Sequence, residues 1–522
     1  MSSITEDLKD RRPLPQDQWR TETTPAHIAA TLAAGLALFY LMQAVYRIYF
    51  HPLRAFAGPL RARFSEDLLY NISKTDFPEE AFEALHNKHR TKAIRIGPNE
   101  LHLSDIELYK VIYSQTNPYL KHSQFYDGFN TPHTIFAETD PALHKERRRL
   151  LSPMFSRATL LKLEPVFCDK IFRWGQKVNR VWSMGPINIY SALRQVSGAP
   201  RLLLTTEIIM EFAFSKAANM IEEHETEFRS WYLDAFDVGN KSLVEMQYRP
   251  WLLKASRLLP LSTVKYLNRE VAQLLHVIEF AGDCMREWQA SNTKTSHPVL
   301  FEALESLSDA EKVTEANDIL VAGSDTTAST LTTGIYYILS DAHIHAQLVQ
   351  SLDDGIPNGV QLPSLAQLQK IDYLTACVME SIRMGMASPG RLPRVVPGGG
   401  AAPLVVDGKV VPPGTVVSIS AYTMHTSTEA WGPDACSFNP SRWQGPDAKR
   451  LEQYQCTFSK GARMCMGQNI AVAEITMILA FIFRNYEVCL VPGTPAPRRI
   501  DRFTMHFADP GLPIKFVPRH QK

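Results

Sequence analysis

The chain has 522 residues, of which 45% are hydrophobic, and this is long enough to enclose a large core. Its formal net charge of +1 argues against nucleic acid as a partner, because nucleic-acid-binding proteins carry a marked positive excess. The seven cysteines show neither a CxxC pair nor an even framework, which argues against a disulfide scaffold or a zinc site and indicates a reducing compartment.

The first predicted element is an apolar helix near the N-terminus. No Asp, Glu, Lys or Arg occurs from Thr23 to Tyr46. About 20 apolar residues suffice to cross a bilayer, so we predict a short leader at residues 1–26 and a transmembrane helix at residues 27–46. A cleaved signal peptide is the alternative, but a charged leader precedes the apolar run and no small-x-small cleavage site follows it.

A connector is predicted at residues 47–60, where Pro52 and Pro59 stand seven residues apart. Proline fixes φ and removes a hydrogen-bond donor. We therefore expect a stiff, non-helical hinge, followed by one large globular domain over residues 61–522.

The globular part is predicted to be mainly α with small β-sheets. Short β regions are expected at residues 92–103 and 404–420, the second with turns at Asp407-Gly408 and Pro413-Gly414. The predicted helices include residues 143–155, 160–182, 206–234 and 468–483.

A long helix is predicted from Ser308 to about Ser340. Ser308 and Glu311 have the spacing of a capping box, in which the N-cap serine and the glutamate three residues later satisfy each other's backbone N–H groups. The helix is apolar along much of its surface, as expected of a helix buried in the middle of a domain.

An acid and a hydroxyl lie side by side near the centre of this helix, in the run from Ala322 to Thr327. Gly323 would allow the close approach of a flat group. Asp325 and Thr326 together form a proton-relay pair of the kind that dioxygen cleavage requires. A solvent-facing polar patch on an ordinary helix is the alternative.

Three charged residues form a candidate buried network. Glu380 and Arg383 are three residues apart and share one helix face, and Arg442 follows in a proline-containing turn. Such a pair is usually a solvated surface ion pair, but the surrounding helix is apolar and favours burial.

One loop near the C-terminus predicts a haem-iron site. It contains Phe458, Gly461, Arg463, Cys465 and Gly467, and an apolar helix follows at once. Backbone N–H groups and the helix dipole favour the thiolate of a cysteine at such a junction. The glycines allow close backbone approach, and the arginine suits a carboxylate. These are the features of haem iron with an axial cysteine, whereas a buried free cysteine is the plainer alternative.

Together these motifs resemble those of the cytochrome P450 family, from the membrane span to about Val517. The loop matches the haem-binding signature at every position, and residues 322–327 match the oxygen-activation motif. The resemblance implies haem b with Cys465 as its axial ligand, and a rigid Glu380–Arg383–Arg442 network behind the loop.

The resemblance also implies which residues hold the haem propionates. Arg148, Arg394 and Arg463 are the expected ligands, and His144 stands where the family often has tryptophan. Variable loops are expected to line the substrate pocket at residues 125–136, 229–262 and 387–396. The hinge and the haem loop are similar to those of fungal microsomal members.

The function implied is that of a monooxygenase that inserts one atom of O2 into a lipophilic small molecule, such as a fungal terpenoid or polyketide. Electrons would come from NADPH-cytochrome P450 reductase, with cytochrome b5 as a second candidate donor, because no nucleotide-binding fingerprint occurs in the chain. Lys145, Arg147 and Lys460 are candidates for the docking face. The expected location is the endoplasmic reticulum membrane, single-pass, with a cytosolic catalytic domain.

Two alternatives remain open from the sequence. One is a haem-thiolate isomerase, dehydratase or peroxygenase that needs no reductase. The other is a non-catalytic haem-binding membrane protein. Neither would need the intact pair Asp325 and Thr326.

Overall fold

The computed structural model comprises two compact units, Met1–Ala55 and Phe56–Lys522. The residues that it describes are 25–193, 204–214, 231–256, 269–290 and 297–519, together with residues 258, 260, 263 and 266.

The first unit is dominated by helix α1 (Pro25–Val45), which continues as a π-helical turn over Tyr46–Phe50. No side chain of α1 is buried. Among the described residues, one helix, Pro25–Phe50, is long and apolar enough to cross a membrane, with a mean hydropathy of 1.9. The helix expected at residues 27–46 is therefore present and runs a few residues further.

The expectation of a non-helical hinge is wrong for residues 47–50 and 52–55. Pro52–Ala55 forms a 3₁₀ helix that begins at the proline itself. Proline is tolerated at the first position of a helix, because the N–H it lacks would have no helical partner there. The next N–H, that of Leu53, donates to Nδ1 of His51 at 3.1 Å.

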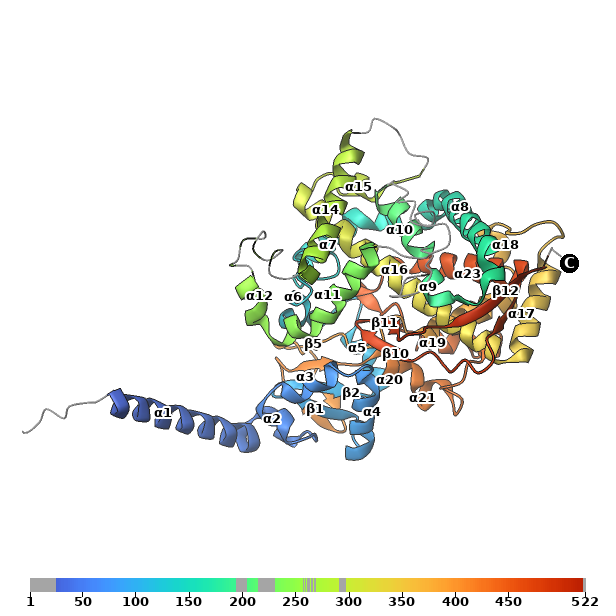
Figure 1. Ribbon diagram of the computed structural model, residues 1–522. Helices are drawn as coiled ribbons and strands as arrows, with labels where there is room; N and C mark the ends of the chain where they lie inside the picture. The colour runs from blue at the N-terminus through green and yellow to red at the C-terminus, as the bar shows by residue number, and fades with distance from the viewer. Residues whose placement is uncertain are drawn as a thin grey trace, which may run out of the picture. The chain divides into compact units, whose positions relative to one another are not determined.

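The second unit is mainly α (Figure 1). Its helices are α2 (Arg61–Phe64), α3 (Asp67–Ser73), α4 (Pro78–His89), α5 (Tyr109–Ile112), α6 (Ser123–Asp127), α7 (Pro141–Leu151), α8 (Arg157–Val181), α9 (Ile189–Leu193), α10 (Leu204–Phe214), α11 (Trp231–Tyr248), α12 (Pro250–Ser256), α14 (Arg269–Ala290), α15 (Leu300–Ala303), α16 (Asp309–Ser340), α17 (Ala342–Gly355), α18 (Leu365–Leu368), α19 (Asp372–Gly385), α20 (Ala421–Thr426), α21 (Thr428–Trp431), α22 (Ala448–Leu451) and α23 (Gln468–Asn485).

Its strands are short and form small sheets. They are β1 (Ala93–Gly97), β2 (Glu100–Leu103), β3 (Leu120–Lys121), β4 (Ile187–Asn188), β5 (Arg394–Val395), β6 (Leu404–Val406), β7 (Lys409–Val411), β8 (Val416–Ser418), β9 (Tyr486–Leu490), β10 (Arg499–Arg502), β11 (Thr504–Phe507) and β12 (Pro513–Pro518). The largest sheet has the order β1-β2-β8-β5-β3, and β10 and β11 form a separate hairpin. The antiparallel register of β3 and β5 places Lys121 opposite Arg394.

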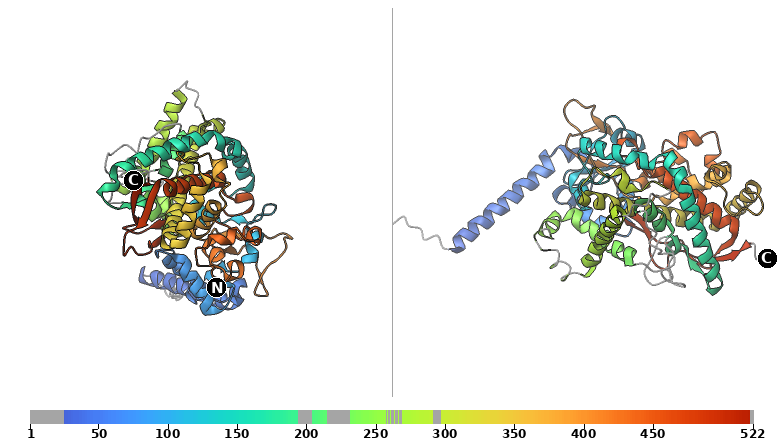
Figure 2. Two further views of the ribbon diagram at one scale, coloured as in Figure 1. Left: turned by 90° about the vertical axis from the view of Figure 1, so that its right-hand side faces the viewer. Right: turned by 90° about the horizontal axis from the view of Figure 1, so that it is seen from above.

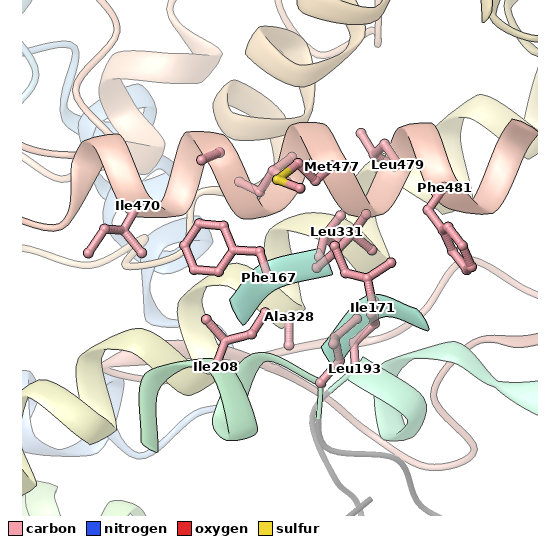
Figure 3. Packing of buried hydrophobic residues seen from close by; sticks show 14 of the residues in the cluster. Phe167, Ile171, Leu193, Ile208, Ala328, Leu331, Ile470, Met477, Leu479 and Phe481 are labelled. Atoms are coloured by element: carbon pink, nitrogen blue, oxygen red, sulfur yellow. The ribbon is translucent and has the colours of Figure 1, made fainter. Parts of the chain in front are cut away.

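Helix α16 forms the centre of the second unit, where it contacts α10, α14, α19 and α23 (yellow in Figure 2). Figure 3 shows how apolar side chains of neighbouring helices meet there: Phe167 and Ile171 of α8, Leu331 of α16 and Met477 of α23 point into one core. A helix buried on several sides is held mainly by this packing, since the buried apolar area is large.

Most of the predicted elements are confirmed, including the capping box of Ser308 and Glu311 at the start of α16. The two predicted β regions correspond to β1–β2 and β6–β8. Of the helix expected over residues 206–234, residues 206–214 lie in α10 and residues 231–234 lie in α11. Residues 215–230 lie outside the described part of the chain.

Candidate functional site

The cysteine loop is closed by its own backbone. The N–H of Cys465 donates to the carbonyl of Phe458 at 2.9 Å, and that of Met464 donates to Gly461 at 3.1 Å. Gly467 is the N-cap of α23, so the cysteine stands two residues before the cap. The loop therefore holds Cys465 next to the N-terminus of a buried helix.

The electrostatic surroundings of Cys465 differ from the expectation. Its side chain is accessible, yet protein surrounds it so closely that burial raises the pKa of the thiol. The N–H groups of Gly467 and Gln468 and the guanidinium of Arg148 oppose this rise. The dipole effect expected from the sequence is present but does not outweigh burial. A bound metal cation reverses such a balance, because it binds the thiolate.

Five basic residues gather beside this loop, and we call them the basic cluster: Lys121, His144, Arg148, Arg394 and Arg463. All four other members act on His144, and burial together with these charges lowers the pKa of His144 to about 3. Burial and Arg394 likewise lower the pKa of Arg463 to about 10. The pKa of Lys121 is also lowered, first by burial and then by Arg394 and Arg463.

Hydrogen bonds fix the arginines of the basic cluster in place. Arg148 donates to the carbonyl of Met464 at 2.9 Å, and Arg463 donates to the carbonyl of Glu138 at 2.8 Å. Arg394, which is 2% exposed, donates to the hydroxyl of Tyr126 at 2.6 Å. Its neighbour across the sheet, Lys121, donates to the carbonyl of Phe136.

The acid and the hydroxyl of α16 face different surroundings. Asp325 is completely buried, and its Oδ2 lies 3.5 Å from Nε2 of His506 on β11. Thr326 is half-buried beside the exposed Ala322, and its hydroxyl donates to the carbonyl of Ala322 at 2.7 Å. Successive helical residues point about 100° apart, which explains why only Thr326 lies on the accessible face.

Two glycines make their close contacts with protein. A Cβ at Gly323 would lie 2.6 Å from the side chain of Ile209 on α10, so its small size serves helix packing. Gly461 has φ +71°, and a Cβ there would lie 2.3 Å from the carbonyl oxygen of Tyr113. At both positions the missing side chain makes room for a protein neighbour.

The predicted charge network is present and buried. Arg383 donates to both oxygens of Glu380, at 2.9 and 2.7 Å, and Arg442 donates to the same carboxylate at 3.1 Å. The N–H of Asn439 and the indole N–H of Trp443 also donate to this carboxylate, at 2.8 and 2.9 Å. A network satisfied in this way makes the region behind the cysteine loop rigid.

One residue of the expected docking face is not at the surface. Arg147 is 8% exposed and pairs with Glu311 at 2.9 Å and with Glu315 at 3.6 Å. It therefore joins α7 to α16, and only Lys145 and Lys460 of the original set retain exposure.

Sequence reasoning missed Lys121, Tyr126 and His506. Lys121 and His506 are polar residues within strands whose remaining side chains are largely apolar. A polar residue in such a strand indicates a buried polar contact, and this was the available signal. Their partners are distant in sequence, so the signal did not identify what they contact.

The donor set fits a haem group. Cys465 offers one accessible sulfur for iron, and the basic cluster offers a concentration of positive charge for two propionates. The carboxylates of Glu138 and Asp318 lie near the cluster and raise the pKa of its members. Burial and the repulsion between the basic side chains have the larger effect, so the pKa values of Lys121 and Arg463 remain lowered.

Comparison with known proteins agrees with this chemistry. The family model for cytochrome P450 matches residues 68–516. The chain is 30% identical to cytochrome P450 monooxygenase macH of Penicillium terrestre, over 90% of this chain and 94% of that protein. It is 28% identical to cytochrome P450 monooxygenase MO6277 of Ascocoryne sarcoides, over 90% and 93% of the two chains. It is 26% identical to cytochrome P450 monooxygenase aneF of Aspergillus aculeatus, over 89% and 94%. The chain belongs to the cytochrome P450 family of haem-thiolate oxidoreductases.

Proposed function

We propose that this chain is a membrane-anchored monooxygenase that inserts one oxygen atom from O2 into a lipophilic small molecule of fungal secondary metabolism, such as a terpenoid or a polyketide. The observation that carries the proposal is the meeting of the Cys465 loop and the basic cluster, in which Arg148 acts on both Cys465 and His144. The relatives described above, which are named cytochrome P450 monooxygenases of fungi, support the reaction class.

Cys465 is the proposed axial ligand of haem b. The N–H groups of Gly467 and Gln468 point toward its sulfur and stabilise negative charge there. When bound, the haem supplies the redox chemistry by which O2 is activated.

The basic cluster is proposed to hold the haem propionates through Arg148, Arg394 and Arg463, with Lys121 as a further donor. Burial and the neighbouring cations of the basic cluster lower the pKa of His144. An imidazole N–H can donate to a carboxylate, so His144 is proposed to contact a propionate by a hydrogen bond.

Thr326 and Asp325 are proposed to deliver protons to the oxygen pocket. Thr326 lies on the accessible face of α16, where its hydroxyl can donate and accept. Asp325 is paired with His506, so it would supply protons from the buried side of the helix after rotating away from that partner.

The proposed electron donor is NADPH-cytochrome P450 reductase, with cytochrome b5 as a second candidate. Lys145 and Lys460 remain the candidate docking residues, since both keep exposure. The proposed location is the endoplasmic reticulum membrane, in which Pro25–Phe50 spans the bilayer once and the second unit is cytosolic.

The deciding experiment is the carbon monoxide difference spectrum of the reduced protein in microsomes, with wild type beside Cys465→Ser. We expect a strongly red-shifted Soret band that is lost in the variant. A band typical of histidine ligation, or one that survives the substitution, would show that Cys465 is not the ligand.

A second experiment separates the monooxygenase from a reductase-independent haem-thiolate enzyme. Thr326→Ala should raise NADPH oxidation that yields no product, because the proton relay is weakened. Unchanged product formation without extra NADPH oxidation would exclude the proposed relay.

A further inference from the structure

A small cavity lies where α4, α11 and the β10–β11 hairpin meet, and it has a volume of about 60 Å³. Its wall combines two carboxylates, Glu79 and Asp501, with the apolar side chains of Phe125, Leu243 and Phe503. A cavity of this size has room for a small polar group, since one water needs about 10–15 Å³ on the same measure.

Glu79 is the unusual residue of this wall. It is 2% exposed, and its Oε2 atom has no hydrogen-bond partner among the described residues. Burial, followed by the repulsion of Asp501, raises the pKa of Glu79 well above its usual range. An unpartnered buried carboxylate oxygen costs free energy, so its persistence calls for a ligand.

Asp501 borders the same space from the other side. A Cβ placed on Gly390 would lie 3.0 Å from Oδ2 of Asp501 and 3.4 Å from Oε1 of Glu79. The other oxygen of Asp501 accepts from the N–H of Phe503 at 2.7 Å. The absence of a side chain at Gly390 therefore leaves room between the two carboxylates.

The nearby positive charge is already shared. Arg391, 7% exposed, bonds to Glu100 and to the hydroxyl of Tyr248. Arg502 lies 3.8 Å from Asp76 and donates to a backbone carbonyl. One buried guanidinium therefore faces three carboxyl groups, those of Glu79, Glu100 and Asp501. The acidic groups outnumber the buried cation, so the site can accept a further cation.

The apolar side of the cavity favours an organic cation over a metal ion. The rings of Phe125 and Phe503 lie 6.4 Å apart, and Phe503 also contacts Phe129 and Phe136, at 4.8 and 5.3 Å. Aromatic faces attract organic cations. Among the described residues, no group of three or more His, Cys, Asp or Glu is placed to hold a metal ion.

We propose that this cavity recognises the ammonium group of a lipophilic amine that is a substrate of the enzyme, with Glu79 and Asp501 as its partners; this proposal rests on the proposed monooxygenase function. The hairpin supplies the geometry. Phe503 lines the cavity, and His506, three residues later, contacts Asp325. Three extended residues span about 10 Å, so an amine held here whose apolar body has that length would reach the part of α16 around Asp325.

The test compares two probes of one skeleton on the purified haem-loaded protein in detergent. One is N,N-dimethyl-4-phenylbutylamine, which is cationic at pH 7.5, about two units below the usual pKa of an alkylamine. The other is the neutral N,N-dimethyl-4-phenylbutanamide. Calorimetry measures binding, and the Soret band reports changes near the iron. We expect the amine to bind about tenfold more tightly than the amide, as one charge-assisted hydrogen bond provides.

The variants are Asp501→Asn and Glu79→Gln, with Glu80→Gln as the matched control. Glu80 is the next residue of α4, but it is 61% exposed and pairs with Arg499. We expect Asp501→Asn and Glu79→Gln each to abolish the preference for the amine, while Glu80→Gln preserves it. If Glu79→Gln incorporates no haem, Asp501→Asn decides alone.

Three results would overturn the proposal. The first is equal binding of both probes to the wild type, and the second is a preference for the amine that survives in either haem-loaded variant. The third is a red-shifted Soret band on amine binding that persists in Asp501→Asn, because the nitrogen would then lie on the iron. If the reduced protein lacks the red-shifted Soret band with carbon monoxide, the proposed function is wrong. Amine binding is still tested, because calorimetry does not depend on that spectrum.

Discussion

The carboxylate of Asp325 on α16 lies 3.5 Å from the imidazole of His506 on β11. Both side chains are buried, and the same nitrogen of His506 lies 3.1 Å from the hydroxyl of Thr504. The β10–β11 hairpin thus reaches the part of α16 where the oxygen-activation motif lies. This contact makes His506 a positioning residue for the proposed proton relay.

Replacing His506 with Leu should lower the ratio of product formed to NADPH consumed about tenfold, because Asp325 would lose the partner that orients it. His506→Gln should restore part of this ratio, since its amide can donate to the carboxylate. Product and NADPH are measured together, and the pH profile of the ratio is recorded for all three proteins. An unchanged ratio in His506→Leu would mean that the pairing has no part in proton delivery.

Lys121→Met should weaken haem retention. Lys121 lies opposite Arg394 in the sheet, and its side-chain nitrogen can donate a hydrogen bond to a propionate. We expect about a tenfold faster transfer of haem to apomyoglobin, which corresponds to one charge-assisted hydrogen bond. Lys110→Met is the control, because Lys110 is 70% exposed and pairs with Glu107. Equal rates in the two variants would remove Lys121 from the haem site.

Glu380→Gln should destabilise the folded protein by about 3–5 kcal/mol, because it leaves Arg383 and Arg442 without their shared buried carboxylate. Urea unfolding and the yield of haem-loaded protein measure the effect. Glu429→Gln is the control, because it removes only a surface ion pair with Lys92. Its free energy of unfolding should change by less than about 1 kcal/mol. A similarly small effect in Glu380→Gln would mean that the network contributes little to stability.

Glu474→Gln should flatten the decline of stability between about pH 4.5 and pH 8. Burial raises the pKa of Glu474 from 4.5 to about 8. The folded state therefore holds a proton that the unfolded state has released, and stability falls as pH rises from about 4.5 to 8 by at most about 1.4 kcal/mol per pH unit.

The measurement is urea unfolding at pH 6 and at pH 8 for wild type, Glu474→Gln and Glu305→Gln. Glu305 is exposed, so its variant should follow the wild type. A parallel decline in all three proteins would contradict a protonated Glu474.

Deletion of residues 1–46 should move the protein from the membrane pellet to the supernatant after a carbonate wash, because it removes most of the helix Pro25–Phe50. The carbon monoxide spectrum of the supernatant shows whether the second unit remains folded. Retention of the deleted protein in the pellet would assign membrane attachment to a surface of the second unit.

The sequence alone determined the class of fold and the centre of the site. Hydrophobic periodicity and capping residues act over a few neighbouring positions, so the helix beginning at Ser308 and the strands after Leu404 could be predicted. The spacing around Cys465 likewise predicted a haem site, because a loop that presents one thiolate needs its glycines and its arginine within ten residues.

The tertiary structure decided what depends on contacts between distant segments. The partner of Asp325, the pairing of Lys121 with Arg394, the packing of Gly323 on Ile209 and the withdrawal of Arg147 from the surface all join different elements. Local patterns carry no information on which elements meet. The pKa of Cys465 is raised for the same reason, since burial depends on the whole fold whereas the helix dipole depends on one helix.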